Sequence, residues 1–141
     1  MNNLFFSIAI ALAIMSCSKN QKTVKLINGE WNATSIKVTN KGGIVGEELT
    51  ASVTYTYIFD NCKLKNDEYC KLAVVVTSGA LSETEFDVFR VAENGKILEV
   101  KDELGSTTIT KIEIVKLEKS NLVLKKTNAG NSVIIAFQKV E

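Results

Sequence analysis

The sequence predicts an all-β fold: an eight-stranded up-and-down antiparallel barrel, preceded by an N-terminal signal-peptide helix. From residue 50 onward, apolar and polar residues alternate with a period of two, which is typical of strands with one buried face. Turn residues interrupt this pattern at intervals short enough for hairpins, and no segment after Gly29 has a helical period. Consecutive hairpins form a meander, and closure removes the unpaired edges of an open meander. A two-sheet sandwich is the alternative architecture.

An apolar run from Leu4 to Ala13 opens the chain and predicts a signal peptide at residues 1–16. As a helix, about a dozen residues rise about 18 Å at ~1.5 Å per residue. A hydrocarbon core of about 30 Å needs roughly 20 residues, so this run is too short for a stable span. The preceding Met1-Asn2-Asn3 has no Lys or Arg, which departs from the usual positively charged start.

The residues that close this run, Ile14-Met15-Ser16-Cys17, resemble a bacterial lipobox. The resemblance implies that Cys17 is lipidated, that it becomes the mature N-terminus, and that its acyl chains anchor the protein in a membrane. The alternative is an ordinary signal peptide cut nearby, with Cys17 incidental. With lipidation, residues 17–27 are the lipidated N-terminus and a polar tether that can end in a turn of helix, and residues 28–141 are the barrel domain.

The charge balance and one missing residue type argue against several classes of function. The chain has 17 basic and 16 acidic residues and a net charge of +1, so it has no basic field for nucleic acid. It has no histidine, which is the commonest general base and the commonest metal ligand. We therefore expect no metal, no cofactor and no catalysis.

The first two expected strands are residues 29–38 and 50–60. In the second, aromatic and β-branched side chains share one face by alternation: Val53, Tyr55, Tyr57 and Phe59. Residues 40–49 between them contain several glycines, but neither Gly-Lys-Ser/Thr nor a helix follows. We therefore expect a flexible loop here and no phosphate-binding site.

Six more strands are expected, at residues 70–78, 84–91, 96–101, 106–117, 121–126 and 132–139. Turn residues separate them, and Asn94-Gly95 is the strongest hairpin signal in the chain. Pairing across a two-residue turn places Val91 opposite Leu98 and Phe89 opposite Val100. These four apolar side chains then share one face, so register and hydrophobicity agree.

Beyond the lipobox, three motifs resemble those of lipocalin-like lipoproteins from Bacteroidetes-type bacteria. They are Ile27-x-Gly29-x-Trp31 at the first strand, Ile114-Val115-Lys116-Leu117 with Leu122-Val123-Leu124 in a late hairpin, and Phe137-Gln138-Lys139 at the end. The resemblance covers nearly the whole chain and implies the same barrel. The second lipocalin motif, of the Thr-Asp-Tyr type, is missing, so the ligand chemistry of secreted lipocalins is not carried over.

Cys62 and Cys70 flank a turn at residues 65–67 and are expected to form a disulfide. If residues whose numbers sum to 132 are paired, as this turn implies, the two cysteines lie opposite each other, with Cβ atoms roughly 4.5–5.5 Å apart. An extracytoplasmic location is oxidising, and closing so small a loop stabilises a fold by roughly 2–3 kcal/mol. Free thiols are the alternative.

Six aromatic residues are candidates for lining a ligand pocket in the barrel: Trp31, Tyr55, Tyr57, Phe59, Phe89 and Phe137. The interior of an eight-stranded barrel is either filled by side chains or holds one small ligand. In the first interpretation these residues fill the interior. In the second they surround an apolar pocket, where tyrosine hydroxyls orient a small hydrophobic ligand.

Five carboxylates are expected to form a solvated rim: Asp60, Glu68, Glu83, Glu85 and Asp87. Paired carboxylates are the catalytic groups of glycoside hydrolases, but nothing in this spacing places two of them across a cleft.

Together these features favour a lipid-anchored protein of the cell envelope whose barrel binds a small hydrophobic ligand and catalyses no reaction. In the alternative, the barrel is filled, and a loop end at residues 40–49 or 127–131 docks a protein or glycan of the envelope. Ser18-Lys19-Asn20-Gln21 lacks the acidic run that marks surface export in some related lipoproteins, which favours an outer-membrane anchor facing the periplasm. An open apolar cavity of several hundred Å³ would favour ligand binding.

Overall fold

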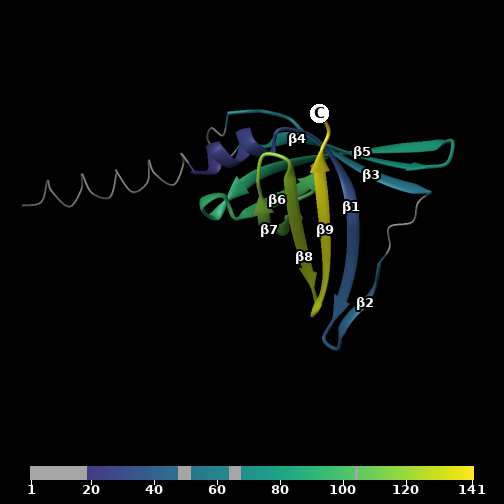
Figure 1. Cartoon of the computed structure of the whole chain (residues 1–141). Helices are drawn as coiled ribbons and strands as arrows, with labels where there is room; N and C mark the ends of the chain where they lie inside the picture. The colour runs from purple at the N-terminus through teal and green to yellow at the C-terminus, as the bar shows by residue number, and fades with distance from the viewer. Residues whose placement is uncertain (1–18, 48–51, 64–67, 104) are drawn as a thin grey trace, which may run out of the picture.

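The structure, a computed structural model, describes residues 19–47, 52–63, 68–103 and 105–141. Over these residues it is an all-β protein with one short helix, at residues 19–27. The strands form one antiparallel sheet in the order β2-β1-β3-β4-β5-β6-β7-β8-β9, and β1 also pairs with β9 (Figure 1). This last pairing closes eight strands, β1 and β3 to β9, into a barrel. The expected closed antiparallel barrel is confirmed, and the sandwich is excluded.

The strand bounds are β1 Gly29–Asn40, β2 Gly43–Glu47, β3 Val53–Phe59, β4 Cys70–Ser78, β5 Leu81–Ala92, β6 Ile97–Asp102, β7 Thr110–Leu117, β8 Asn121–Asn128 and β9 Asn131–Lys139. All strands except β2 were expected from the sequence, and β4 has the expected bounds. The predicted signal peptide, the lipobox and Cys17 lie outside the described residues.

Strand β2 corrects the expectation of a loop at residues 40–49. It pairs with the second half of β1, from Lys37↔Glu47 to Asn40↔Gly43. The turn between the two strands is stabilised by the Asn40 side chain, which accepts a hydrogen bond from the Gly42 amide at 2.8 Å. Gly43 follows with a φ of +122°, which glycine adopts most readily. The glycines therefore belong to a hairpin. Its second strand, β2, pairs only with β1 and lies outside the closed barrel.

The helix at residues 19–27 belongs to the barrel core, where the sequence suggested a polar tether. Val24 and Ile27 are 0 % exposed and pack in the core cluster. Asn20 Oδ1 accepts a hydrogen bond from the Gly95 amide at 2.7 Å, and Gln21 Nε2 donates one to the Cys62 carbonyl at 3.0 Å. The helix therefore covers one end of the barrel, which we call the closed end.

The closed end is filled by large apolar side chains: Trp31, Phe59, Phe89, Leu98, Leu122 and Phe137 are each at most 2 % exposed. The rings of Phe59 and Phe89 meet edge to face, with centroids 5.1 Å apart. Such pairs add to the free energy gained from burial. At this end, the described side chains therefore fill the interior of the barrel.

The predicted register of the hairpin between β5 and β6 is confirmed. Val91 pairs with Leu98, and Phe89 pairs with Val100. The turn itself is longer than predicted, because Ala92↔Ile97 is the last pair and Glu93–Gly95 forms a single 3₁₀ turn. Both turns give the same register, so the buried face of this hairpin is as expected.

Candidate functional site

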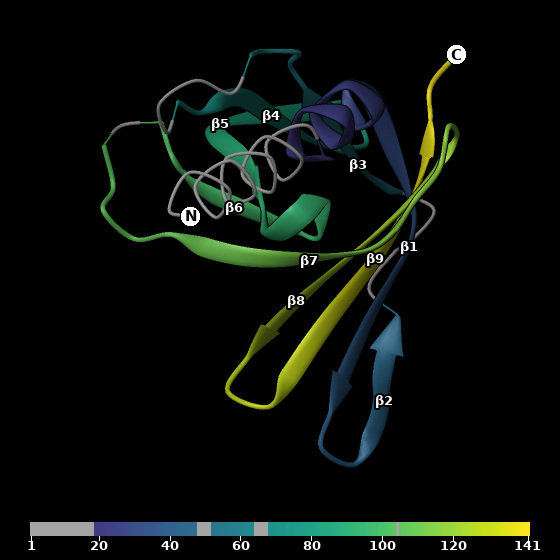
Figure 2. The same ribbon diagram turned by 90° about the vertical axis from the view of Figure 1, so that its left-hand side faces the viewer.

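Two gaps in the strand pairing open the barrel at the end opposite the helix, which we call the mouth. On one edge, strand β1 pairs with β3 over residues 29–32 and with β2 over residues 37–40, and no pairing with either strand is found for residues 33–36 between them. Strand β7 pairs with β8 only over residues 113–117, so the two strands separate beyond Glu113. The barrel therefore divides toward the mouth into two parts, β3 to β7 and β8-β9-β1-β2. Figure 2 shows the second part as hairpins directed away from the rest.

The barrel interior changes from apolar to acidic between the closed end and the mouth. Along the inward face of β5, Val91 and Phe89 are buried, Asp87 is half-buried and Glu85 is exposed. Asp87 pairs directly with Asp102 of β6, so their side chains share this inward face. An antiparallel sheet places paired residues on one side, so three carboxylates lie together on the β5–β6 side of the mouth. We call Glu85, Asp87 and Asp102 the acidic edge.

A pocket of about 420 Å³ lies between this acidic edge and the packed core. Its apolar wall consists of Leu72, Val74, Val100 and Ile112. Its polar lining is Tyr57, Glu85, Asp87, Lys101, Asp102, Ser106, Thr108, Thr110 and Lys126. Of all these residues, Lys126 comes from β8, and the others come from β3 to β7 or the loop before β7. The pocket thus belongs mainly to one part of the divided barrel, and one cation faces it from the other part.

The acidic edge changes the protonation equilibria in the pocket. Burial raises the pKa of Asp87 above its ordinary value of 3.8, and the charges of Glu85 and Asp102 raise it further. Burial also raises the pKa of Tyr57 above 10.0, with added effects from Asp87, Glu85 and Tyr55. At neutral pH Tyr57 therefore presents a neutral hydroxyl, which both donates and accepts hydrogen bonds.

The six aromatic residues expected to line a pocket divide between the core and the mouth. Trp31, Phe59, Phe89 and Phe137 are in the packed core. Tyr57 lines the pocket, and its ring also contacts that of Phe137, with centroids 4.8 Å apart. Tyr55 is half-buried on the same strand, two residues closer to the mouth. The interpretation in which aromatic side chains fill the interior therefore holds at the closed end, whereas Tyr55 and Tyr57 lie where the interior opens.

Cys62 and Cys70 form a disulfide, with Cα atoms 5.6 Å apart. The predicted register is wrong by one residue, because pairs between β3 and β4 such as Phe59↔Leu72 sum to 131. Strand β3 ends at Phe59, so Cys62 lies in the following loop and has no cross-strand partner there. Cys70 is 1 % exposed and pairs with Phe89 of β5. The disulfide attaches the loop to the core at the closed end.

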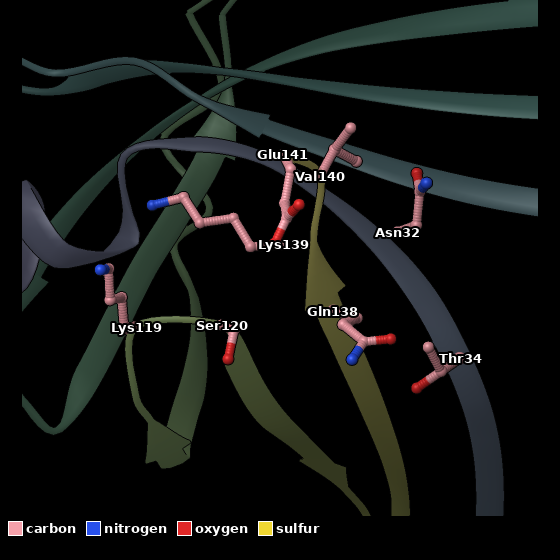
Figure 3. A pocket seen from close by; sticks show the side chains of 8 residues that line it. All are labelled: Asn32, Thr34, Lys119, Ser120, Gln138, Lys139, Val140 and Glu141. Atoms are coloured by element: carbon pink, nitrogen blue, oxygen red, sulfur yellow. The ribbon is translucent and has the colours of Figure 1, made fainter.

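A second, larger hollow of about 800 Å³ lies on the outer wall. Figure 3 shows its lining side chains, which come from β1, from β9 and the C-terminal residues, and from the turn between β7 and β8. They are Asn32, Thr34, Lys119, Ser120, Gln138, Lys139, Val140 and Glu141. Val140 is the one aliphatic residue of this lining, the other seven residues are polar or charged, and the hollow is an open groove, which we call the outer groove. The mouth pocket has the apolar wall typical of a small-molecule site, and we take it as the candidate.

The sequence interpretation missed the acidic edge and most of the pocket wall. Glu85 and Asp87 were expected on a solvated rim, and Asp102 was assigned to a turn. The signal was present in the alternation, because Asp87 and Glu85 precede Phe89 by two and four residues and so share its inward face. Asp60 and Glu68 lie in the loop at the closed end, away from the pocket.

Neither a protein-family model nor a curated protein matches this chain. Within the described ranges, no group of three or more His, Cys, Asp or Glu side chains is arranged to hold a metal ion. None of the described helical residues forms a helix with the length and hydrophobicity needed to cross a bilayer.

Proposed function

We propose that this protein is a lipid-anchored lipoprotein of the bacterial cell envelope, related to the lipocalin-like lipoproteins, that binds a small molecule in the mouth of its barrel. The lipid is attached at Cys17, and the protein faces the periplasm from the outer membrane. The protein catalyses no reaction in this proposal, and it sequesters or delivers its ligand.

The observation that carries the proposal is the pocket of about 420 Å³ between the packed core and the mouth. Small-molecule sites are concave, mostly apolar and roughly 300–1,000 Å³ in volume, with a few polar groups that orient the ligand. Val74, Val100 and Ile112 supply the apolar surface, and the Tyr57 hydroxyl and the Asp87 carboxyl supply orienting groups. The ligand that fits is small and largely apolar, with a polar end that donates hydrogen bonds toward the mouth.

The second candidate function is docking of an envelope protein or glycan. The two loops expected to serve this role lie side by side, because Thr39 of β1 pairs with Ser132 of β9 next to both turns. The Lys41 side chain also packs over Gly130. The outer groove of about 800 Å³ offers a further polar surface on β1 and β9. A polar groove suits a glycan or peptide better than a hydrophobic ligand.

Native mass spectrometry of the protein purified from its own cells tests the ligand-binding proposal. The Val74→Trp variant fills the mouth pocket, because Val74 faces inward between Tyr57 and Glu85. The matched control is Gln138→Trp, an exposed position on β9 in the outer groove. We expect a co-purified small molecule that Val74→Trp loses and Gln138→Trp keeps. Loss of the co-purified molecule in Gln138→Trp alone would indicate that the molecule binds in the outer groove.

A further inference from the structure

The solvent-facing side of the helix at residues 19–27 is basic. Lys19, Lys22 and Lys25 are exposed, and their spacing of three residues places them on one side of the helix. Leu26 is 39 % exposed beside them, whereas Val24 and Ile27 are buried against the barrel. Residues 19–27 include no acidic residue, and none of the ion pairs found among the described residues uses these lysines. We call these three residues the lysine face.

The lysine face has a fixed direction relative to the barrel. The helix is attached to the turn between β5 and β6 through Asn20, to the loop after β3 through Gln21, and to β1 through the Trp31 indole. All three attachments are at the closed end. In Figure 1 the helix, drawn as a purple coil, lies at the side opposite the tip of the β4–β5 hairpin. The lysine face and the mouth therefore belong to opposite ends of the molecule.

The proposed anchor brings this face close to lipid. Cys17 precedes Lys19 by two residues, so their Cα atoms are at most about 7.6 Å apart, because consecutive Cα atoms are ~3.8 Å apart. The headgroup layer on each side of a bilayer is roughly 5–8 Å deep, which is half of the difference between about 40–45 Å for the whole bilayer and about 30 Å for its hydrocarbon core. A chain anchored at Cys17 therefore begins its folded part within or next to the headgroups.

We infer that the lysine face binds the phosphate headgroups of the anchoring membrane, so that the barrel rests on the surface by its closed end and its mouth faces the aqueous side. The inference rests on the proposed lipid anchor at Cys17. Lysine side chains extend toward headgroup phosphates, and Leu26 adds an apolar contact at the interface. The consequence for the proposed function is that the ligand enters and leaves through the aqueous phase and not directly from the bilayer.

Lysine footprinting of the natively lipidated protein tests this orientation. The protein is inserted into vesicles of phosphatidylethanolamine and phosphatidylglycerol and treated with a membrane-impermeant amine acylating reagent. The labelling rate of each lysine is divided by its rate in urea-unfolded protein. We expect rates several-fold lower at Lys19, Lys22 and Lys25 than at Lys41 and Lys126, which are exposed at the mouth end. Equal rates at both ends would overturn the orientation.

Two variants separate lipid contact from other causes of protection. Lys22→Glu with Lys25→Glu reverses two exposed charges, so the fold is kept, and we expect Lys19 to become more reactive. The matched variant, Lys41→Glu with Lys126→Glu, should leave Lys19 protected, and an equal effect of both variants would overturn the inference. The mass of the N-terminal peptide distinguishes the two proposals. An unmodified Cys17 would refute the lipid anchor. A lipidated Cys17 together with reactive helix lysines would refute the orientation alone.

Discussion

The indole nitrogen of Trp31 donates a hydrogen bond to the carbonyl of Ile27 at 2.7 Å, and both residues are fully buried. This bond joins the last turn of the helix to the first strand of the barrel. Carbonyls in the last turn of a helix have no partner within the helix, and a buried one without a partner is costly. Trp31 therefore fills the closed end and also satisfies the end of the helix that covers it.

Replacing Trp31 with Phe should lower the free energy of unfolding by about 1–3 kcal/mol, because the Ile27 carbonyl then stays buried without its donor. Urea unfolding measures the loss. It is followed by circular dichroism, because Trp31 is the only tryptophan and the variant has none left for tryptophan fluorescence. The Lys139→Gln variant is the control, because Lys139 lies over the same ring at 5.0 Å and removing its charge leaves the indole bond intact. A loss below about 0.5 kcal/mol in Trp31→Phe would show that the bond has little net effect.

The assignment of residues 19–27 to the core is tested by two adjacent positions. Ile27→Ala should lower the free energy of unfolding by about 2–5 kcal/mol, as buried Ile→Ala changes do. Leu26→Ala, at a position 39 % exposed, should change it by about 0.5 kcal/mol or less. Equal small effects in denaturant unfolding would mean that this segment behaves as a tether and does not pack in the barrel.

The Cys62–Cys70 disulfide should make stability depend on redox conditions. It closes a short loop, the cysteines being 8 residues apart in sequence. Reduction should therefore cost roughly 2–3 kcal/mol on the chain-entropy estimate. Guanidinium unfolding with and without reductant measures the cost, and the Cys62→Ser variant should be insensitive to reductant. A free-thiol assay on the unfolded, unreduced mature protein should find no reactive thiol from this pair.

The barrel was predictable because short turns fix the register of its hairpins. The turn between β5 and β6 fixes Val91 opposite Leu98, and the apolar pattern agrees with that pairing. The loop after β3 has no such constraint, since β3 ends at Phe59 and β4 begins at Cys70. A loop of this length permits several registers, so the predicted pairing of Cys62 with Cys70 was wrong by one residue although the disulfide was right.

Beyond a turn at the end of the tether, the helix was not predictable from local sequence. Its buried residues, Val24 and Ile27, form a single i, i+3 pair, which is too short a pattern to establish a helical period. An isolated helix of nine residues is also marginal in water, so its stability comes from packing on the barrel.

The pocket was not predictable from local sequence either, because it depends on tertiary structure. The gaps between β1 and β3 and between β7 and β8 arise from strand pairing.

Gly95→Ala should destabilise the protein through its contact with the helix. Gly95 has a φ of +84°, and an added methyl group would meet the Thr23 hydroxyl. The matched control is Gly79→Ala, because Gly79 has a φ of +59° but nothing within 4 Å of the added methyl. The control should show the backbone cost alone, about 1–2 kcal/mol, and Gly95→Ala a larger loss. Adding Thr23→Ala should restore part of the difference; equal losses at both glycines would refute the contact.

The raised pKa of Asp87 predicts how stability changes with pH. Between 3.8 and its higher folded-state pKa, the native protein binds more protons at this group than the unfolded chain does. Stability therefore falls as pH rises through this interval, and below 3.8 the group is protonated in both states and the penalty is absent. Asp87→Asn removes the titration, so the variant should gain stability relative to wild type on going from pH 3 to pH 7.

Urea unfolding of wild type and Asp87→Asn at both pH values measures this difference, and the exposed Asp60 provides the control. Asp60→Asn lies outside the pocket and controls for the loss of one negative charge from the protein. Removing the neighbouring charge with Glu85→Gln should bring the folded-state pKa of Asp87 closer to its ordinary value, which NMR titration of the carboxyl can detect. A gain of Asp87→Asn that is constant from pH 3 to pH 7 would mean that Asp87 titrates alike in both states, and that neither burial nor the acidic edge affects it.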